Sequence, residues 1–180
     1  AVTAYGGSGY NSGGNGGAGT IYWMSTSQTY GDLVVDNNNT TTSESTGTPL
    51  SGTTTSFNNI TISNKGRLTN TTLIQVSDIM SLNNSWYMPS GTNTVQLQAG
   101  TLNLSNGATI THPETATSEV YRIDIKVTVN MNIEGTSTVN VNGRGYLGGY
   151  SGGNNSYYGR TSGNTTTNGS YYDCGGSYGG

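Results

Sequence analysis

Cleavage of a polysaccharide requires clustered carboxylates together with a base or a metal ion. The chain has nine Asp and Glu residues and one histidine, and the acids are scattered along it. Asp124 lies between Arg122 and Lys126, which we interpret as a solvated row of ion pairs on one face of a strand. His112 precedes a proline between two strand-like runs, without metal-ligand spacing, and we expect it to be solvated. The sequence therefore predicts no enzyme, no cofactor and no metal site.

The pattern Asn-x-Ser/Thr is abundant and marks candidate sites for N-linked glycans if the chain is secreted into a glycosylating compartment. In a chain this rich in Asn, Ser and Thr, chance supplies many such matches. The candidate glycosylation sites are Asn38, Asn39, Asn59, Asn70, Asn83, Asn103, Asn154, Asn164 and Asn168.

Glycine and tyrosine are concentrated near the ends of the chain. Residues 1–20 and 143–180 hold 21 of the 29 glycines, and the second segment holds seven of the 13 tyrosines. A disordered linker is one interpretation. We favour an ordered segment that packs against a neighbouring copy, because a tyrosine buries a large apolar face and suits a solvated linker poorly. The predicted assembly residues are Tyr146, Tyr150, Tyr157, Tyr158, Tyr171, Tyr172, Cys174 and Tyr178. Cys174 is the single cysteine, so it either pairs between chains or stays a free thiol.

The composition favours an extracellular or cell-surface protein with an uncharged, hydrogen-bonding surface. Charged residues make up 8% of the chain, against about 25% in ordinary soluble domains, and the net charge is −3. The six Lys and Arg residues form no basic stripe, so no nucleic-acid partner is expected. No stretch approaches the roughly 20 apolar residues of a membrane span. No leader is recognisable, and both ends lie in glycine-rich sequence, so we expect a processed subunit or a piece of a longer product.

Between residues 20 and 142 the apolar residues recur at every second position, which is the period of a half-buried strand. The clearest run predicts one inward row together with Leu102 and Leu104, and its members are Ile123, Ile125, Val127, Val129, Met131 and Ile133. Similar units begin at Ile60, Leu102 and Met131. Each has two apolar residues, a turn rich in Asn or Gly, and a further apolar residue. Such turns tolerate left-handed backbone.

These repeats predict an all-β chain built as a parallel β-helix, a solenoid flanked by extended glycine- and tyrosine-rich segments. The alternative is an antiparallel β-sandwich, which also uses many short strands. The predicted division is a glycine-rich segment over 1–19, a β-helix domain over 20–142 and an assembly segment over 143–180.

Four stretches, "GAGTIYWMSTSQTYGDLVVDN", "ITISNKGRL", "LNLSNGATI" and "VNVNGRGYLGGYSGG", carry a resemblance to a known type of protein. In texture they resemble modules of large bacterial cell-surface or secreted proteins with a right-handed, pectin-lyase-like β-helix and glycine-rich segments. The resemblance implies a secreted adhesive or structural module and transfers no catalytic residue.

Three functions follow as hypotheses. The first is an extracellular structural module that assembles with identical subunits into a filament, sheath or surface array. The second is a carbohydrate-binding adhesin module, for which Trp23, Trp86 and Tyr87 are the residues to watch, with core packing as their alternative role. The third and weakest is a polysaccharide lyase or hydrolase.

Overall fold

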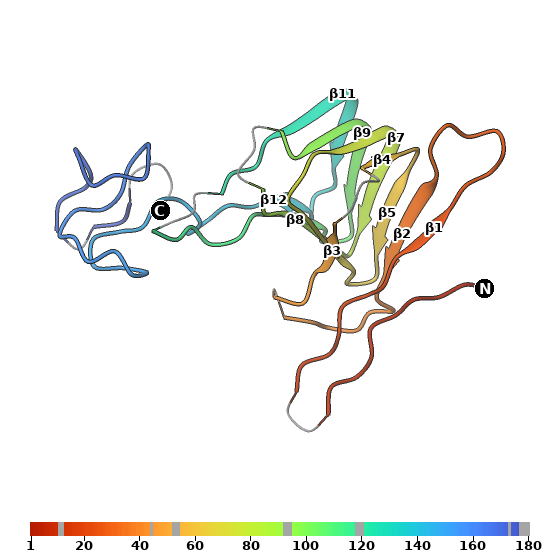
Figure 1. Cartoon of the computed structure of the whole chain (residues 1–180), viewed down its shortest axis with the longest axis horizontal. Coiled ribbons are helices and arrows are strands. Elements are labelled where there is room, and N and C mark those ends of the chain that lie inside the picture. The colour runs from red at the N-terminus through yellow and green to blue at the C-terminus, as the bar shows by residue number, and fades with distance from the viewer. Residues whose placement is uncertain are drawn as a thin grey trace. The chain divides into compact units, whose positions relative to one another are not determined.

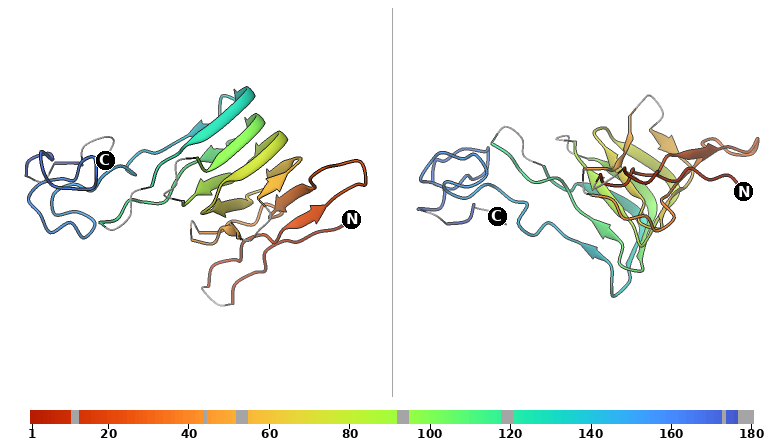
Figure 2. Two further views of the ribbon diagram at one scale, coloured as in Figure 1. Left: turned by 45° about the horizontal axis from the view of Figure 1, so that its top comes forward. Right: turned by 90° about the horizontal axis from the view of Figure 1, so that it is seen from below.

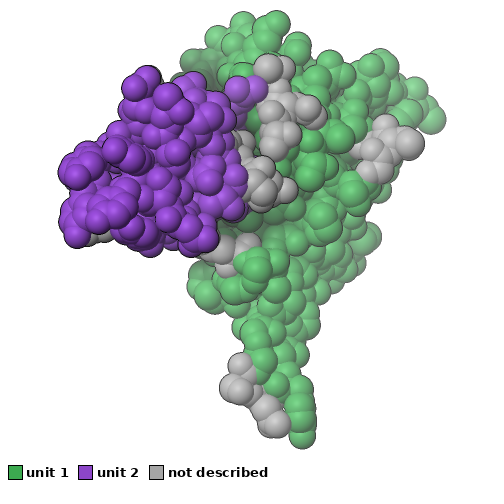
Figure 3. Space-filling model, turned by 60° about the vertical axis from the view of Figure 1, so that its left-hand side comes forward, with its two compact units in different colours: residues 1–111, 123–139 green, residues 112–122, 140–180 purple. Residues whose placement is uncertain are grey.

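The structure is a computed structural model that describes residues 1–10, 13–43, 45–51, 55–91, 95–117, 121–172 and 174–176. Its contacts divide the chain into two compact units, coloured separately in Figure 3. Unit 1 comprises residues 1–111 and 123–139, and unit 2 comprises residues 112–122 and 140–180. The predicted three-part division stays a prediction.

All the named strands belong to unit 1 (Figure 1). They are β1 (Ile21–Trp23), β2 (Asp32–Asp36), β3 (Thr48–Leu50), β4 (Ser56–Phe57), β5 (Ile60–Ser63), β6 (Arg67–Asn70), β7 (Ile74–Asn83), β8 (Trp86–Pro89), β9 (Leu97–Ser105), β10 (Thr109–Ile110), β11 (Ile125–Ile133) and β12 (Thr138–Val139). The described residues include no helix, and hence none that could cross a membrane.

The strands form two sheets. The first has the order β1-β2-β5-β7-β9-β11, with β4 also paired to β7, and the second has the order β12-β10-β8-β6-β3. From β5 onward the chain alternates between the sheets, so that each strand pairs in parallel with the next strand of its own sheet. Figure 2 shows the strands of the first sheet succeeding one another from the orange to the cyan end.

The prediction of a parallel β-helix is wrong. The first sheet is mixed, because the chain turns back after β1 and pairs it antiparallel with β2, Ile21 opposite Val34 and Trp23 opposite Asp32. Tyr22 holds this hairpin, since its hydroxyl accepts a hydrogen bond from the Gly31 N–H at 3.1 Å. The antiparallel sandwich is wrong as well, because the other named pairings are parallel. All-β also describes the chain poorly, since unit 2 has no strand beyond the Thr161–Thr165 bridge in its described part.

The core of unit 1 follows from the parallel register, which places equivalent side chains directly beside one another. Side chains alternate across a strand, so every second register position faces inward. One inward row of the first sheet is Leu33, Ile60, Met80 and Leu102, and the next is Val35, Ile62, Leu82 and Leu104. All eight side chains are buried. The second sheet supplies a facing row of Leu68, Tyr87 and Ile110.

The predicted inward row of β11 is only partly correct. Leu102 and Leu104 are buried as expected, and the side chains of Ile123, Ile125 and Val127 pack against the core while remaining partly exposed. Val129 is 79% exposed, because residues 128 and 129 bulge opposite the single residue Gly100. Met131 and Ile133 are 41% and 46% exposed, since β11 is the last strand of its sheet.

The expectation of left-handed turns is confirmed at the ends of β5 and β9. Asn64 and Asn106 have φ of 51° and 53°, and Gly107 has φ of 79°. Asn84, which follows β7, has φ of 45°. These turns stack like the strands, because the Asn64 N–H donates to the Asn83 carbonyl at 3.2 Å and the Asn84 N–H to the Ser105 carbonyl at 3.1 Å. Asparagine tolerates this conformation, so it can occupy the same place in each turn. The hydrogen bonds between stacked turns then help to keep successive strands in register.

Truncating a side chain should lower the free energy of unfolding in the core but not in the bulge of β11. Leu102→Ala removes a fully buried side chain from between Met80 and Met131, and we expect it to lower the free energy of unfolding by about 2–5 kcal/mol. Val129→Ala should change it by less than about 0.5 kcal/mol, because that side chain is in solvent. Urea unfolding of both variants measures the difference. Equal effects would contradict the assigned register.

Candidate functional site

Unit 2 is built from backbones that approach one another at glycines. A Cβ on Gly169 would overlap the carbonyl oxygen of Gly159, and one on Gly176 would overlap that of Tyr146. A Cβ on Gly148 would lie 2.7 Å from the Cys174 carbonyl oxygen. Only residues without a side chain allow such contacts. The glycine-rich segment is therefore packed in its described part.

Hydrogen bonds fix how these backbones align. The Thr161 N–H donates to the Thr165 carbonyl at 2.9 Å, and the Gly159 N–H donates to the Ser170 carbonyl at 2.9 Å. The two segments thus form a hairpin, with residues 157–158 beside residues 171–172. The Arg160 N–H donates to the Leu147 carbonyl at 2.8 Å, and the Tyr150 N–H donates to the Ser156 carbonyl at 3.0 Å. These bonds add residues 147–150 as a third segment.

Five tyrosines follow one another along the edge of this scaffold, and we call them the tyrosine ladder. Their order is Tyr150, Tyr157, Tyr172, Tyr171 and Tyr158. Successive ring centroids lie 5.2, 4.9, 6.0 and 5.7 Å apart, within the range of favourable aromatic pairs. All five side chains are exposed, from 44% at Tyr158 to 67% at Tyr171. The sequence suggested these tyrosines as a group but not their pairing, which depends on the hairpin.

Two members of the ladder have an unfavourable backbone. Tyr150 has φ of 53° and Tyr172 has φ of 46°, the left-handed region that bulky residues rarely adopt. Both rings pair with Tyr157, which stands between them in the pairing order. Glycine would be the easier residue at either position, and the neighbouring sequence is rich in it. Backbone strain of this kind clusters at functional sites, which makes the ladder the candidate site of this chain.

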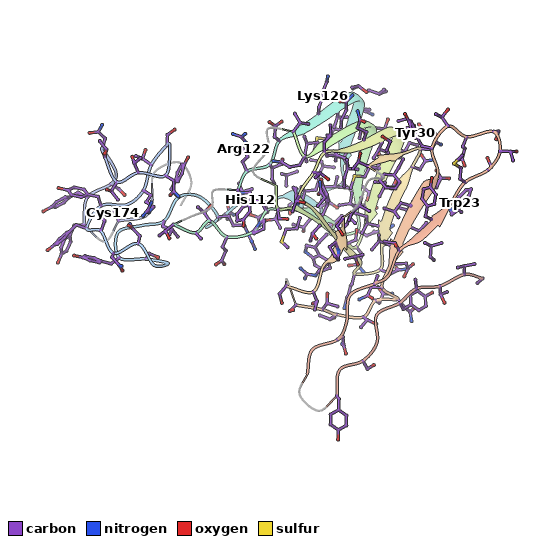
Figure 4. The ribbon with its side chains drawn as sticks, viewed as in Figure 1. Trp23, Tyr30, His112, Arg122, Lys126 and Cys174 are labelled. Atoms are coloured by element: carbon purple, nitrogen blue, oxygen red, sulfur yellow. The ribbon has the colours of Figure 1, made fainter. Side chains whose placement is uncertain are left out.

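The other predicted assembly residues lie nearby in sequence but outside the ladder. Tyr146 is half-buried, and its carbonyl faces Gly176. Cys174 is an exposed free thiol in unit 2 (Figure 4). Tyr178 lies outside the described residues. Their predicted role in assembly stays a prediction.

The candidate glycosylation sites differ in how accessible they are. Exposed asparagines are Asn38, Asn39, Asn83 and Asn168, and half-buried ones are Asn59, Asn103 and Asn164. Asn70 and Asn154 are each only 2% exposed. Each uses its amide nitrogen inside the fold, Asn70 toward the carbonyls of Thr72 and Gln96 and Asn154 toward those of Gly148 and Tyr158. Whether any of the nine asparagines carries a glycan stays a prediction.

Unit 1 carries a second surface of interest, the outer face of the first sheet. A shallow groove of about 820 Å³ crosses it, lined by hydroxyl and amide side chains that include Thr61, Ser81, Asn103 and Asn132. These four residues occupy one register position in β5, β7, β9 and β11. The Asn132 amide donates to the Asn103 side-chain oxygen at 2.7 Å, so amides bond along the row.

Two carboxylates that sequence reasoning left unassigned have structural roles. Asp32 accepts hydrogen bonds from the backbone N–H and the side-chain amide of Asn59, both at 3.0 Å. Asp36 accepts from the Ser63 hydroxyl at 3.0 Å and from the Asn64 amide at 2.8 Å. They connect β2 to β5 at both ends. Polar residues at matching register positions of the neighbouring strands β2 and β5 were the signal for this role.

The residues considered for carbohydrate binding are not gathered in one place. Tyr87 is fully buried, and burial raises the pKa of its hydroxyl while the Asn70 side chain opposes that shift. Trp86 is half-buried and lies under the Arg67 guanidinium, 4.3 Å from the ring centroid. Trp23 is 52% exposed on β1, at the other edge of the first sheet from β11 (Figure 4). Of the three, Tyr87 is a core residue.

The residues considered for catalysis also lie apart. Within the described ranges, no three His, Cys, Asp or Glu side chains are close enough to hold a metal ion. Asp124 precedes β11, and its backbone exchanges hydrogen bonds with Gln96. The expectation of a solvated His112 is wrong, since its side chain is 5% exposed in unit 2. Its Nδ1 lies 2.8 Å from the Pro113 carbonyl oxygen, and Arg144 donates to the His112 carbonyl at 2.7 Å.

The chain has no match among family models, curated proteins or solved structures. Its function is therefore argued from these surfaces alone.

Substitutions at Tyr150 should separate ring contact from backbone strain. Tyr150→Ala loses the contact with Tyr157 but keeps the left-handed backbone. We therefore expect it to lower the free energy of unfolding by about 1 kcal/mol. Tyr150→Gly loses the same contact but relieves strain of about 1–2 kcal/mol, so its stability should match or exceed that of the parent. Urea unfolding measures both. An alanine variant as stable as the glycine variant would argue against strain.

Acidification should reveal the burial of His112. Burial lowers its pKa below the ordinary 6.5, with a further lowering by Arg144 and partial opposition from the hydrogen bond to Pro113. Above about pH 6.5 both the folded and the unfolded chain hold it neutral. Below that pH the unfolded chain takes up the proton first, so stability falls as the pH drops toward the folded pKa.

The measurement is the melting temperature at about pH 8 and about pH 5.5, on either side of the ordinary histidine pKa. On acidification the melting temperature of the parent should fall further than that of His112→Gln, because the variant has no imidazole to take up that proton. If both lose the same amount, protonation of His112 is not linked to folding.

Proposed function

We propose that this chain is an extracellular or cell-surface structural module that assembles with identical copies into a filament, sheath or surface array. The observation that carries the proposal is the open edge of the first sheet. Among the described residues, β9 is the only strand paired with β11, which leaves one side of a nine-residue strand without partners.

Exposed sheet edges normally carry features that prevent pairing with other chains, such as lysine, proline or a very short strand. Lys126 is the single charged residue of β11, and residues 127–133 contain no charged residue and no proline. Met131 and Ile133 on β11 and Val139 on β12 are between 41% and 46% exposed. Further strands added in register to β11 and to β12 would cover these side chains and satisfy the free backbone groups. Burying the rest of each aliphatic side chain would contribute about 1 kcal/mol.

The tyrosine ladder supports the same function from unit 2. Its five rings form an exposed aromatic strip on a backbone that is already ordered, so little further entropy is lost on contact with a neighbour. Tyrosine is also favoured at protein interfaces, because it combines apolar area with a hydrogen-bonding hydroxyl.

The second candidate is a carbohydrate-binding adhesin module. The row of hydroxyl and amide side chains across β5, β7, β9 and β11 favours it, since these groups recur at the strand spacing and can hydrogen-bond a polar polymer laid over them. A catalytic role is not proposed.

Assembly should depend on the β11 edge. We expect the parent to form larger species as its concentration rises, as measured by sedimentation velocity and electron microscopy. Met131→Lys combined with Ile133→Lys places charges on the open edge, and this variant should stay monomeric because charged edges resist pairing.

The matched control is Gln75→Lys combined with Ser81→Lys, which adds the same charge to β7, a strand paired on both sides. It should assemble like the parent.

A third variant, Tyr171→Ser with Tyr172→Ser, tests the ladder as a contact surface. A parent that stays monomeric throughout would reject the proposal, as would an edge variant that assembles normally. Circular dichroism checks that each variant remains folded.

A further inference from the structure

The tyrosine ladder places phenol rings next to each other on the protein surface. Tyr157 and Tyr172 have the shortest centroid separation, 4.9 Å, with ring planes 37° apart. Their side chains are 46% and 50% exposed, so an oxidant can reach both. We propose that the ladder is a site of oxidative phenol coupling, in which Tyr157 and Tyr172 of one chain join as a dityrosine cross-link.

The reaction balances with an oxidant of the peroxidase class and one molecule of hydrogen peroxide. Each phenol loses one electron and one proton to give a phenoxyl radical. The two radicals form a carbon–carbon bond between ring positions ortho to the hydroxyls, and each coupled carbon returns its hydrogen to a phenol oxygen. The two electrons and two protons removed reduce hydrogen peroxide to two molecules of water. The chain thereby loses two hydrogen atoms.

The fold makes this pair the favoured one. Tyr157 and Tyr172 come from opposite sides of the hairpin, which the Gly159–Ser170 and Thr161–Thr165 hydrogen bonds hold together. Two radicals held in contact react far faster than two that must meet by diffusion. The Tyr158 and Tyr171 rings lie farther apart, at 5.7 Å, and their planes differ by 57°. Tyr172 has a left-handed backbone, with φ of 46°, at the position where its ring pairs with that of Tyr157.

The geometry also argues against a sugar-stacking platform. Rings that bind one sugar face share a plane, whereas the planes of adjacent rings here differ by 35° to 58°. The rings of Tyr157 and Tyr172, with centroids 4.9 Å apart, are instead close enough to react with each other. The cross-link would fasten residues 157 and 172 without any contribution from a second copy, so it does not depend on assembly.

The test treats the dilute 180-residue chain with a peroxidase and hydrogen peroxide. Trypsin cleaves after Arg144 and Arg160, so it separates peptide 145–160 from peptide 161–180. Coupling should replace these two peptides by one species whose mass is their sum less two hydrogen atoms. That species should show dityrosine fluorescence, and fragmentation should place the bond between Tyr157 and Tyr172.

Two substitutions and one condition decide the outcome. Tyr157→Phe should lower the yield of the joined peptide about tenfold or more, because phenylalanine forms no phenoxyl radical. Tyr10→Phe is the control, since Tyr10 is 89% exposed and outside the ladder, and it should leave the yield unchanged. Urea should abolish the product if the fold brings the rings together. An unchanged yield in Tyr157→Phe, products joined only between chains, or a bond mapped to Tyr158 and Tyr171 would overturn the assignment.

Discussion

Parallel pairing in register is the constraint on which unit 1 depends. Because each strand lies directly beside its equivalent, whatever occupies one register position meets the same kind of side chain on the next strand. Aliphatic residues therefore form continuous inward rows, and asparagines in left-handed turns stack at the ends of the strands. The same rule brings Asn103 and Asn132 together as an amide pair on the outer face. A polar, sparsely charged sequence can fold on these terms because most of the aliphatic residues in its long strands fall into rows.

Unit 2 meets the same need for packing without aliphatic rows. Its backbones approach so closely at Gly159 and Gly169 that peptide groups take the place of core side chains. Such a scaffold buries little apolar area of its own, and the large side chains are left at its edge. The tyrosines gather there because the hairpin gives them no interior to enter. Retaining Tyr150 and Tyr172 in left-handed backbone is hard to explain by stability alone, which is the reason for assigning the ladder a function.

The sequence predicted the local structure of unit 1 better than its topology. The alternation of apolar residues located most strands, and the Asn- and Gly-rich turns were recognised because those residues tolerate positive φ. The hairpin of β1 and β2 was missed, because residues 24–31 carry no two-residue turn signal. The pairing of Ile21 with Val34 depends on tertiary packing and not on a local sequence pattern. Val129 was misplaced because a bulge is set by the neighbouring strands, here by Gly100. The ladder could be predicted as a composition but not as contacts, which depend on backbone pairing between segments without periodicity.

The scarcity of charge links the two surfaces that define this chain. With a net charge of −3 over 180 residues, electrostatic repulsion between copies is weak, so local features of the surface decide whether copies associate. Hydroxyl and amide groups keep the outer face of the first sheet hydrated, and they leave β11 with Lys126 as its single charge against pairing. In a more highly charged protein, the same edge and the same exposed tyrosines would be opposed by long-range repulsion. Low charge, open edge and aromatic strip are thus mutually consistent with the self-assembly that we propose.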